Sequence, residues 1–148
     1  MDVLSKADLC RLIPHQEPMC LLDSVEEWSA THLICRTATH RAAFNPLRRR
    51  DQLEAICGLE YAAQAIAVHI AILLETERPP NEGYLVAVRD LVLQRNRLDD
   101  IDADLTVEVT RVVGEETNFI YTFCVCDDRQ VLLTGRATIL VTDRKRVL

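Results

Sequence analysis

The sequence predicts an α+β fold in which one long, buried helix is wrapped by an antiparallel β-sheet. The order of the predicted segments is a short helix, a short strand pair, one long helix and then several strands in succession, which is typical of such a fold. The long helix is apolar on nearly every side, as buried helices are. The chain has 148 residues, of which 49% are hydrophobic. This length suits one domain with one core, spanning residues 1–148.

The first third of the chain is predicted to hold a helix and two strands. The helix runs from a capping residue, Ser5, to about Ile13, which a proline follows. Strands are expected at Met19–Leu22 and His32–Thr39, where apolar and polar residues alternate, and Asp23–Ser29 is expected to form a turn region.

The long helix is predicted to begin at Asp51, which together with Glu54 resembles a helix cap, and to end near Glu75. Residues 42–50 before it contain an Asn-Pro step and are expected to form a loop. The apolar run Ala62–Leu74 is too short and too often interrupted to span a bilayer, which needs about 20 apolar residues. We therefore expect it to be buried inside the protein.

Only strands are predicted after the Pro- and Gly-containing connection at residues 79–83. They are expected at Tyr84–Leu93, Leu105–Thr110, Phe119–Cys126 and Val131–Val141. The turn at residues 127–130 should join the last two strands as a hairpin.

Composition excludes several functions and suggests a compartment. The net charge of −6 argues against a nucleic-acid surface, which needs a concentrated basic face. Six cysteines are scattered through apolar segments without a C-x-x-C pair, so we expect buried free thiols rather than a metal site. With no signal-peptide pattern at the start, the expected location is the reducing cytoplasm.

Glu60 is the residue that most suggests chemistry. It lies on the predicted long helix among small and aliphatic side chains, where loss of solvation would favour proton transfer. Gln64, one turn later, could donate a hydrogen bond to Glu60 or to a ligand. The neighbouring alanines, which include Ala63 and Ala67, leave room for a substrate tail. The alternative is a glutamate that reaches solvent or pairs with an arginine, among alanines present as good helix formers.

Of the four histidines, His40 is best placed to meet Glu60, because it ends a predicted strand and opens the loop that leads to the helix. His69 is expected to be a core or interface histidine with satisfied hydrogen bonds. No histidine spacing supports a metal ion, and no cofactor-binding motif is present. Arg48, Arg49 and Arg50 form a basic cluster that is either solvated or attracts an acidic carrier protein or the phosphates of coenzyme A.

Several segments together resemble the hot-dog family of β-hydroxyacyl-(acyl carrier protein) dehydratases. The resemblance covers nearly the whole chain, and Glu60 stands at the family's catalytic glutamate. The stretch from Thr39 to Tyr61 is similar to a divergent branch that occurs in bacterial clusters making aryl polyenes. The segments that carry the resemblance are Leu12-Ile13-Pro14-His15, Pro18-Met19-Cys20-Leu21-Leu22-Asp23, Gly58-Leu59-Glu60-Tyr61-Ala62-Ala63-Gln64-Ala65, Val86-Ala87-Val88-Arg89-Asp90, Asp104–Val109 and Gly135-Arg136-Ala137.

The resemblance implies dehydration of 3-hydroxyacyl thioesters, carried by acyl carrier protein or coenzyme A, in fatty acid or polyene-type lipid biosynthesis. It also implies a homodimer whose sheets join and whose active sites lie at the subunit boundary, with no metal or organic cofactor. The family's loop histidine is replaced here by the stretch Phe44–Leu47, which contains Asn45. We therefore expect His40 to act as the base and Glu60 as the acid, while a backbone N–H near Gly58 polarises the carbonyl and Asn45 and Gln64 contact the substrate.

The sequence is also compatible with two other functions. A thioesterase on the same fold would use Glu60 to activate water or to attack the thioester, with Asn45 and Gln64 orienting the carbonyl. A non-catalytic acyl-binding or partner subunit would fit the missing loop histidine.

Overall fold

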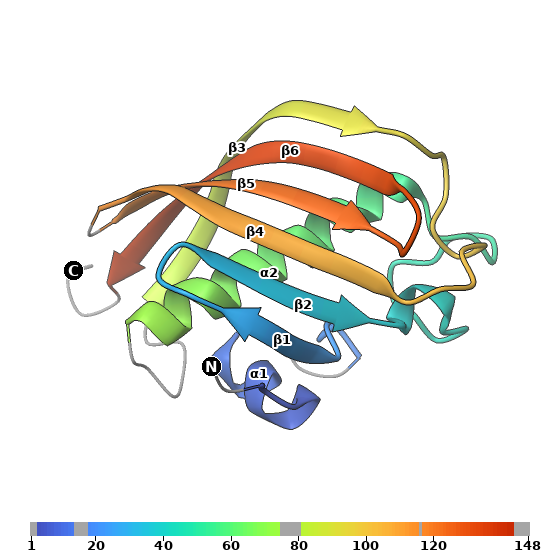
Figure 1. Cartoon of the computed structure of the whole chain (residues 1–148), viewed down its shortest axis with the longest axis horizontal. Coiled ribbons are helices and arrows are strands. Elements are labelled where there is room, and N and C mark those ends of the chain that lie inside the picture. Colours follow the sequence, from blue (N-terminus) through green and yellow to red (C-terminus); the bar gives the residue numbers. More distant parts are fainter. Residues whose placement is uncertain (1–2, 14–17, 75–80, 116, 144–148) are drawn as a thin grey trace.

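The computed structural model describes residues 3–13, 18–74, 81–115 and 117–143, and they form six strands and two helices (Figure 1). All six strands belong to one antiparallel sheet in the order β1-β2-β4-β5-β6-β3. The elements are α1 (Lys6–Leu12), β1 (Ser24–Trp28), β2 (His32–Thr37), α2 (Gly58–Leu73), β3 (Asn81–Leu93), β4 (Leu105–Gly114), β5 (Asn118–Cys126) and β6 (Val131–Asp143), with short 3₁₀ turns at Thr39–Arg41 and Ala55–Cys57. The predicted α+β architecture is confirmed.

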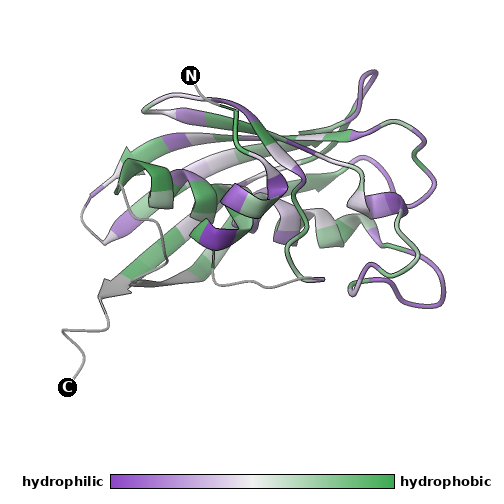
Figure 2. Ribbon diagram, turned by 90° about the horizontal axis from the view of Figure 1, so that it is seen from below, coloured by the Kyte–Doolittle hydropathy of each residue, from purple (hydrophilic) through white to green (hydrophobic). Residues whose placement is uncertain are grey.

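The sheet curves around α2, and the main core lies between them (Figure 1). Alternate residues of β5, from Phe119 to Val125, are buried, as expected for a strand with one face on the core. Seen from below, α1 and α2 lie on the same face of the sheet, and apolar colours dominate the ribbon of α2 (Figure 2). The helix contacts β2, β4 and β5.

The stretch Ala55–Leu73 is long and apolar enough to pass as a membrane span by length and composition, but 56% of its most apolar window is buried inside the protein. We interpret it as the core helix of the fold, in agreement with the burial predicted from the sequence.

The segment before β2 differs from the prediction. Ser24–Trp28 is a strand rather than a turn, and its polar residues are tolerated because it forms one end of the sheet. Met19–Leu22 is not a strand, although Leu21 and Leu22 are buried. Side chains rather than a neighbouring strand bind its backbone: Gln64 bonds to Met19 O and Leu21 N.

The helix also begins later than predicted. Asp51 has a positive φ of 65° in a tight turn and does not cap α2. Leu53 N donates to Asp99, and Ala55 N donates to the Asn96 carbonyl, so the intervening backbone is held extended. The helix therefore starts at Gly58, after the 3₁₀ turn, and Glu60 lies in its first turn.

Two of the six cysteines are joined, contrary to the expectation of free thiols. A disulfide links Cys10 on α1 to Cys20 in the segment before β1, while Cys35, Cys57, Cys124 and Cys126 are free. Disulfides persist in oxidising compartments, so cysteine usage no longer argues for a reducing one. Among the described residues, no group of three or more His, Cys, Asp or Glu side chains is arranged to hold a metal ion.

Candidate active site

Glu60 lies half-buried in the first turn of α2. Its carboxylate Oε1 is 3.3 Å from Gln64 Nε2, which donates a hydrogen bond to it. On the same side of the helix, Ala63 and Ala67 are also half-buried, at spacings of three and seven residues. The carboxylate therefore lies at one end of a half-buried stripe of small side chains on a mostly buried helix.

Gln64 is completely buried, and its amide is bonded at both ends. Its Oε1 accepts from Leu21 N at 2.9 Å, and its Nε2 donates to Met19 O at 2.7 Å as well as to Glu60. These bonds fix which end of the amide faces Glu60. Because each polar atom of Gln64 already has a protein partner, the structure favours positioning of Glu60 over the predicted direct contact with substrate.

Asn45 is 5% exposed, and its amide is also used internally. Nδ2 donates to Thr39 O and to the Tyr61 hydroxyl, both at 2.9 Å, while Oδ1 accepts from Leu47 N. Asn45 thus fastens the loop before α2 to Tyr61, the residue that follows Glu60. The predicted substrate contact of Asn45 finds no free amide atom in this arrangement.

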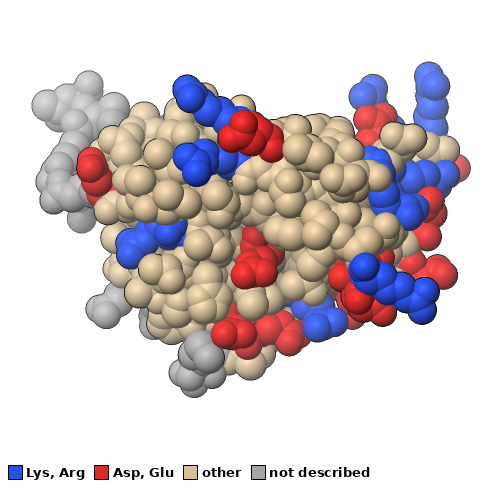
Figure 3. Space-filling model, turned by 45° about the horizontal axis from the view of Figure 1, so that its top comes forward, with Lys and Arg blue, Asp and Glu red and all other residues tan. Residues whose placement is uncertain are grey.

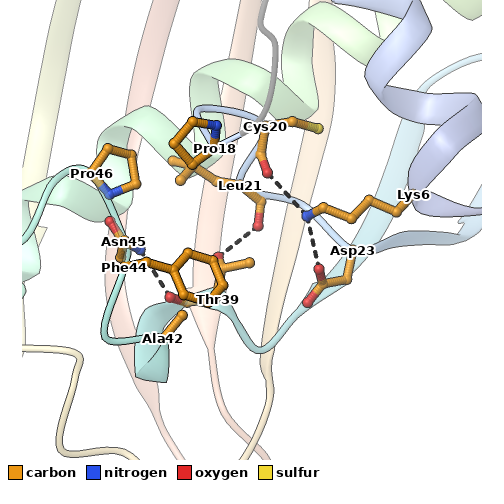
Figure 4. A pocket seen from close by; sticks show the side chains of 10 residues that line it. All are labelled: Lys6, Pro18, Cys20, Leu21, Asp23, Thr39, Ala42, Phe44, Asn45 and Pro46. Carbon is orange, nitrogen blue, oxygen red and sulfur yellow. Dashed lines mark hydrogen bonds and ion pairs between the residues drawn. The ribbon is translucent and has the colours of Figure 1, made fainter.

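A cavity of about 240 Å³ lies beside this loop (Figure 4). On one side Lys6 donates to Cys20 O and forms an ion pair with Asp23, and on the other Phe44 is 75% exposed. Its lining residues are Lys6, Pro18, Cys20, Leu21, Asp23, Thr39, Ala42, Phe44, Asn45 and Pro46.

The structure does not bring His40 to Glu60. His40 is fully buried, and its Nε2 lies 2.9 Å from the carbonyl oxygen of Ile101, so Nε2 carries the proton and donates. Burial, the main cause, lowers the pKa of His40, which therefore favours the neutral ring. A base that takes a proton from a substrate must reach it, and this side chain is enclosed by protein instead.

Gly58 is placed for packing rather than for binding a carbonyl. Its N–H is bonded to the carbonyls of Ala55 and Ile56 in the preceding 3₁₀ turn. A Cβ at this position would lie 2.5 Å from Cδ2 of Leu133, which is itself fully buried. The glycine thus allows the start of α2 to approach β6 closely.

The arginine cluster divides into one inward and two outward side chains. Arg48 donates to the carbonyls of Asp51 and Arg41, whereas Arg49 and Arg50 are exposed. Basic and acidic side chains are interleaved at this end of the molecule (Figure 3). Several pair there, as in Arg41–Asp104 and Arg95–Asp100. In the part of the chain that the structure describes, no ion pair involves Arg49 or Arg50.

Sequence reasoning missed the residues that connect these groups. Tyr61 is fully buried, and Thr39 and Leu21 share its hydrogen-bond network. Tyr61 follows Glu60 directly, but nothing in its spacing indicates which loop its hydroxyl meets. His69 is a satisfied core histidine as predicted, bonded to the Tyr121 hydroxyl at 2.6 Å and to Ser29 O at 2.8 Å.

Comparison with known proteins gives both a family and a fold. The ApeP-like family model, described as ApeP dehydratase, matches residues 7–147. No curated protein sequence matches the chain. Among solved structures, the chain is similar to the dehydratase heterocomplex ApeI:P from Xenorhabdus doucetiae, with 22% identity over 93% of each chain and a TM-score of 0.82.

Thioesterases are more distant neighbours in fold. A thioesterase from Pseudomonas aeruginosa has 12% identity over 80% of this chain and 79% of its own, with a TM-score of 0.57. A hypothetical thioesterase from Streptococcus pneumoniae, solved with coenzyme A, has 14% identity over 80% and 84%, with a TM-score of 0.57. The predicted hot-dog fold is confirmed by these similarities.

Proposed function

The chain belongs to the ApeP-like dehydratase family, and we propose that Glu60 is the group that moves the proton when the protein removes water from 3-hydroxyacyl thioesters. The resemblance to the aryl-polyene branch of hot-dog dehydratases is thereby confirmed. The observation that supports Glu60 is its half-buried carboxylate in the first turn of α2, held by the Gln64 amide.

The dehydration requires two proton transfers, one from the carbon next to the thioester carbonyl and one to the hydroxyl oxygen on the neighbouring carbon. A base takes the proton from the carbon next to the thioester carbonyl, and the electrons of that C–H bond form the new C=C bond. The C–O bond at the next carbon breaks, and the hydroxide leaves with a proton as water. A single carboxylate can accept the first proton and return it to the leaving hydroxyl. We assign both transfers to Glu60, because His40 is enclosed and bonded to Ile101.

The acyl chain is proposed to lie along the half-buried stripe that Ala63 and Ala67 form with Glu60. Small side chains leave room for a hydrocarbon chain, whose burial is favourable at roughly 25 cal/mol per Å². The carrier is proposed to approach Arg49 and Arg50, whose exposed charges suit an acyl carrier protein or the phosphates of coenzyme A. Within the family, a polyene-type acyl chain is the substrate that we propose.

We propose that the protein assembles through β3. This strand ends the sheet, so its outer backbone groups have no strand neighbour among the described residues. Leu85, Val86 and Leu93 on it are 41%, 55% and 44% exposed. A second copy that adds its own β3 would complete the backbone pairing and cover these side chains. Size measurements should show a dimer that Val86→Lys weakens, and a monomeric wild-type protein would contradict the proposal.

The decisive experiment compares Glu60→Gln with Glu54→Gln on a 3-hydroxyacyl thioester. Both variants make the same chemical change, but Glu54 is exposed and precedes the helix. We expect Glu54→Gln to retain turnover, and Glu60→Gln to lose it by a factor of at least ~10², as is typical for loss of an acid–base group. Mass spectrometry should show loss of one water with the thioester intact.

Three results would change this assignment. Full activity of Glu60→Gln would remove Glu60 from the mechanism. Release of free thiol and acid would indicate a thioesterase, the activity of its more distant neighbours in fold. Turnover only after addition of a second hot-dog chain would indicate a partner subunit in a heterocomplex instead of a self-sufficient homodimer.

A further inference from the structure

A continuous series of hydrogen bonds runs from the loop before α2 to the segment that holds Gln64. Asn45 Nδ2 lies 2.9 Å from the Tyr61 hydroxyl, and this hydroxyl lies 2.7 Å from Thr39 Oγ1. Thr39 Oγ1 in turn lies 2.7 Å from Leu21 O. Figure 4 shows the Thr39–Leu21 bond and the Asn45 side chain beside it. The backbone N–H of Leu21 then bonds to Gln64.

The direction of each hydrogen bond follows from the groups at the two ends. The Asn45 amide N–H can only donate, and the Leu21 carbonyl can only accept. Thr39 therefore donates its hydroxyl proton to Leu21 O, and Tyr61 donates its own to Thr39 Oγ1. Burial, the main cause, raises the pKa of Tyr61 to about 12, so this phenol remains a donor over the working pH range.

The Leu21 carbonyl also accepts from the Thr37 hydroxyl at 2.6 Å. Two threonine hydroxyls thus bond directly to one residue of an irregular segment, and the Tyr61 hydroxyl bonds to one of these threonines. A buried hydrogen-bonded network of this kind fixes a single arrangement of the main chain.

We propose that Tyr61 and Thr39 are positioning residues that orient Glu60 through Leu21 and Gln64. This inference rests on the proposed role of Glu60. The two hydroxyls place the backbone of Leu21, whose N–H binds the Gln64 oxygen and so turns the Gln64 N–H toward the Glu60 carboxylate.

The orientation of the Gln64 amide is the step on which the inference depends. The oxygen and nitrogen ends of an amide are almost equal in shape, so packing alone does not choose between them. If the segment at residues 19–21 moves, Gln64 can reverse and present its oxygen to the Glu60 oxygen. Two acceptors then face each other, and the carboxylate moves away from its catalytic position.

Tyr61→Phe tests the inference, with Tyr121→Phe as the matched control. Both tyrosines are completely buried, and both hydroxyls take part in buried hydrogen bonds, with Thr39 and Asn45 for Tyr61 and with His69 for Tyr121. We expect Tyr61→Phe to lower kcat about tenfold, because small displacements of catalytic groups have effects of this order or larger. The KM for the thioester should stay unchanged, and Tyr121→Phe should retain kcat although it loses stability.

Conservative changes at Thr39 give a second readout. Thr39→Ser keeps the hydroxyl and should retain kcat, whereas Thr39→Val removes it and should lower kcat as Tyr61→Phe does. In a Gln64→Met background, Tyr61→Phe should have no further effect on kcat, because both act through the same amide.

The outcomes separate this inference from the proposed function. If Glu60→Gln is inactive but Tyr61→Phe has full kcat, the positioning role is refuted and the function stands. Equal losses of kcat in Tyr61→Phe and Tyr121→Phe would show a general effect of stability and refute it too. A raised KM with unchanged kcat would indicate a substrate contact in place of positioning. Full activity of Glu60→Gln would refute the proposed function itself.

Discussion

Removal of the Cys10–Cys20 disulfide should lower the free energy of unfolding by about 2.7 kcal/mol. The two cysteines are 10 positions apart in the sequence. Closing a loop of that length removes roughly 9 cal/mol/K of entropy from the unfolded chain, which corresponds to the energy above near room temperature. In a chain of this size, each kcal/mol shifts the melting temperature by about 2–4 °C, so the expected decrease is about 5–10 °C.

The assay is thermal unfolding of the oxidised protein, the reduced protein and a Cys10→Ala/Cys20→Ala variant. The control is Cys124→Ala/Cys126→Ala, which removes two half-buried thiols that are not joined to each other. Cys20 directly precedes Leu21, so reduction should also lower kcat if Leu21 orients Gln64. Titration of six thiols in the denatured, unreduced protein would show that the bond is absent and refute the reasoning, as would an unchanged melting temperature on reduction.

Three further predictions concern packing and pH. Gly58→Ala should destabilise the protein by up to about 2 kcal/mol in urea unfolding. Overpacking against Leu133 costs roughly 1–3 kcal/mol, and the gain in helix propensity offsets about 1 kcal/mol of that cost. A more stable variant would show that Leu133 moves aside freely. Burial lowers the pKa of His40 from 6.5 in the folded protein, so the unfolded chain binds more protons than the folded protein just below that pH. The free energy of unfolding should therefore decrease as the pH falls below 6.5, and it should decrease less steeply in His40→Gln. The hydrogen bond from Arg97 lowers the pKa of Asp99 from 3.8 to about 2, so its contribution should be complete above pH 3.8 and lost as the pH falls through about 2. Acid unfolding of Asp99→Asn should lack that component, and an unchanged profile would argue against it.

Sequence reasoning predicted the fold class and most elements because their patterns are strong. Alternation identified the strand that became β4, and the all-round apolar run identified α2. It failed at Ser24–Trp28, since a strand at the end of the sheet carries polar residues that resemble a turn. It also failed at the start of α2, where pairing with residues 96–99 overrides the helix-cap pattern. Contacts between residues far apart in the sequence determine both the strand and the start of the helix, and a local sequence pattern carries no information about such contacts.

The candidate site was predicted less completely than the fold. Glu60 and Gln64 were singled out together, and the structure brings them into contact. Proximity in the sequence suggested that His40 would meet Glu60, but the 3₁₀ turn that contains it directs its ring to Ile101. Asn45 was selected because it lies in the stretch that replaces the family's loop histidine, and its three hydrogen bonds are made within the loop and to Tyr61. Which polar groups remain available to a ligand depends on loop geometry that residue types do not reveal.

The strand order has a consequence for how the protein is made. Among the described strands, β3 pairs with β6, which is synthesised after β4 and β5. The strands that contact α2 include β4 and β5, which also follow it in the chain. At a synthesis rate of roughly 5–20 residues per second, the apolar helix is synthesised several seconds before the strands that pack on it are complete. During that interval the nascent chain exposes the apolar surface of α2, to which chaperones can bind. The hydrogen bonds that position Glu60 join residues 19–64, which precede these strands, so they can form before the sheet is complete. A chain truncated before β6 should nevertheless aggregate through the uncovered side of α2.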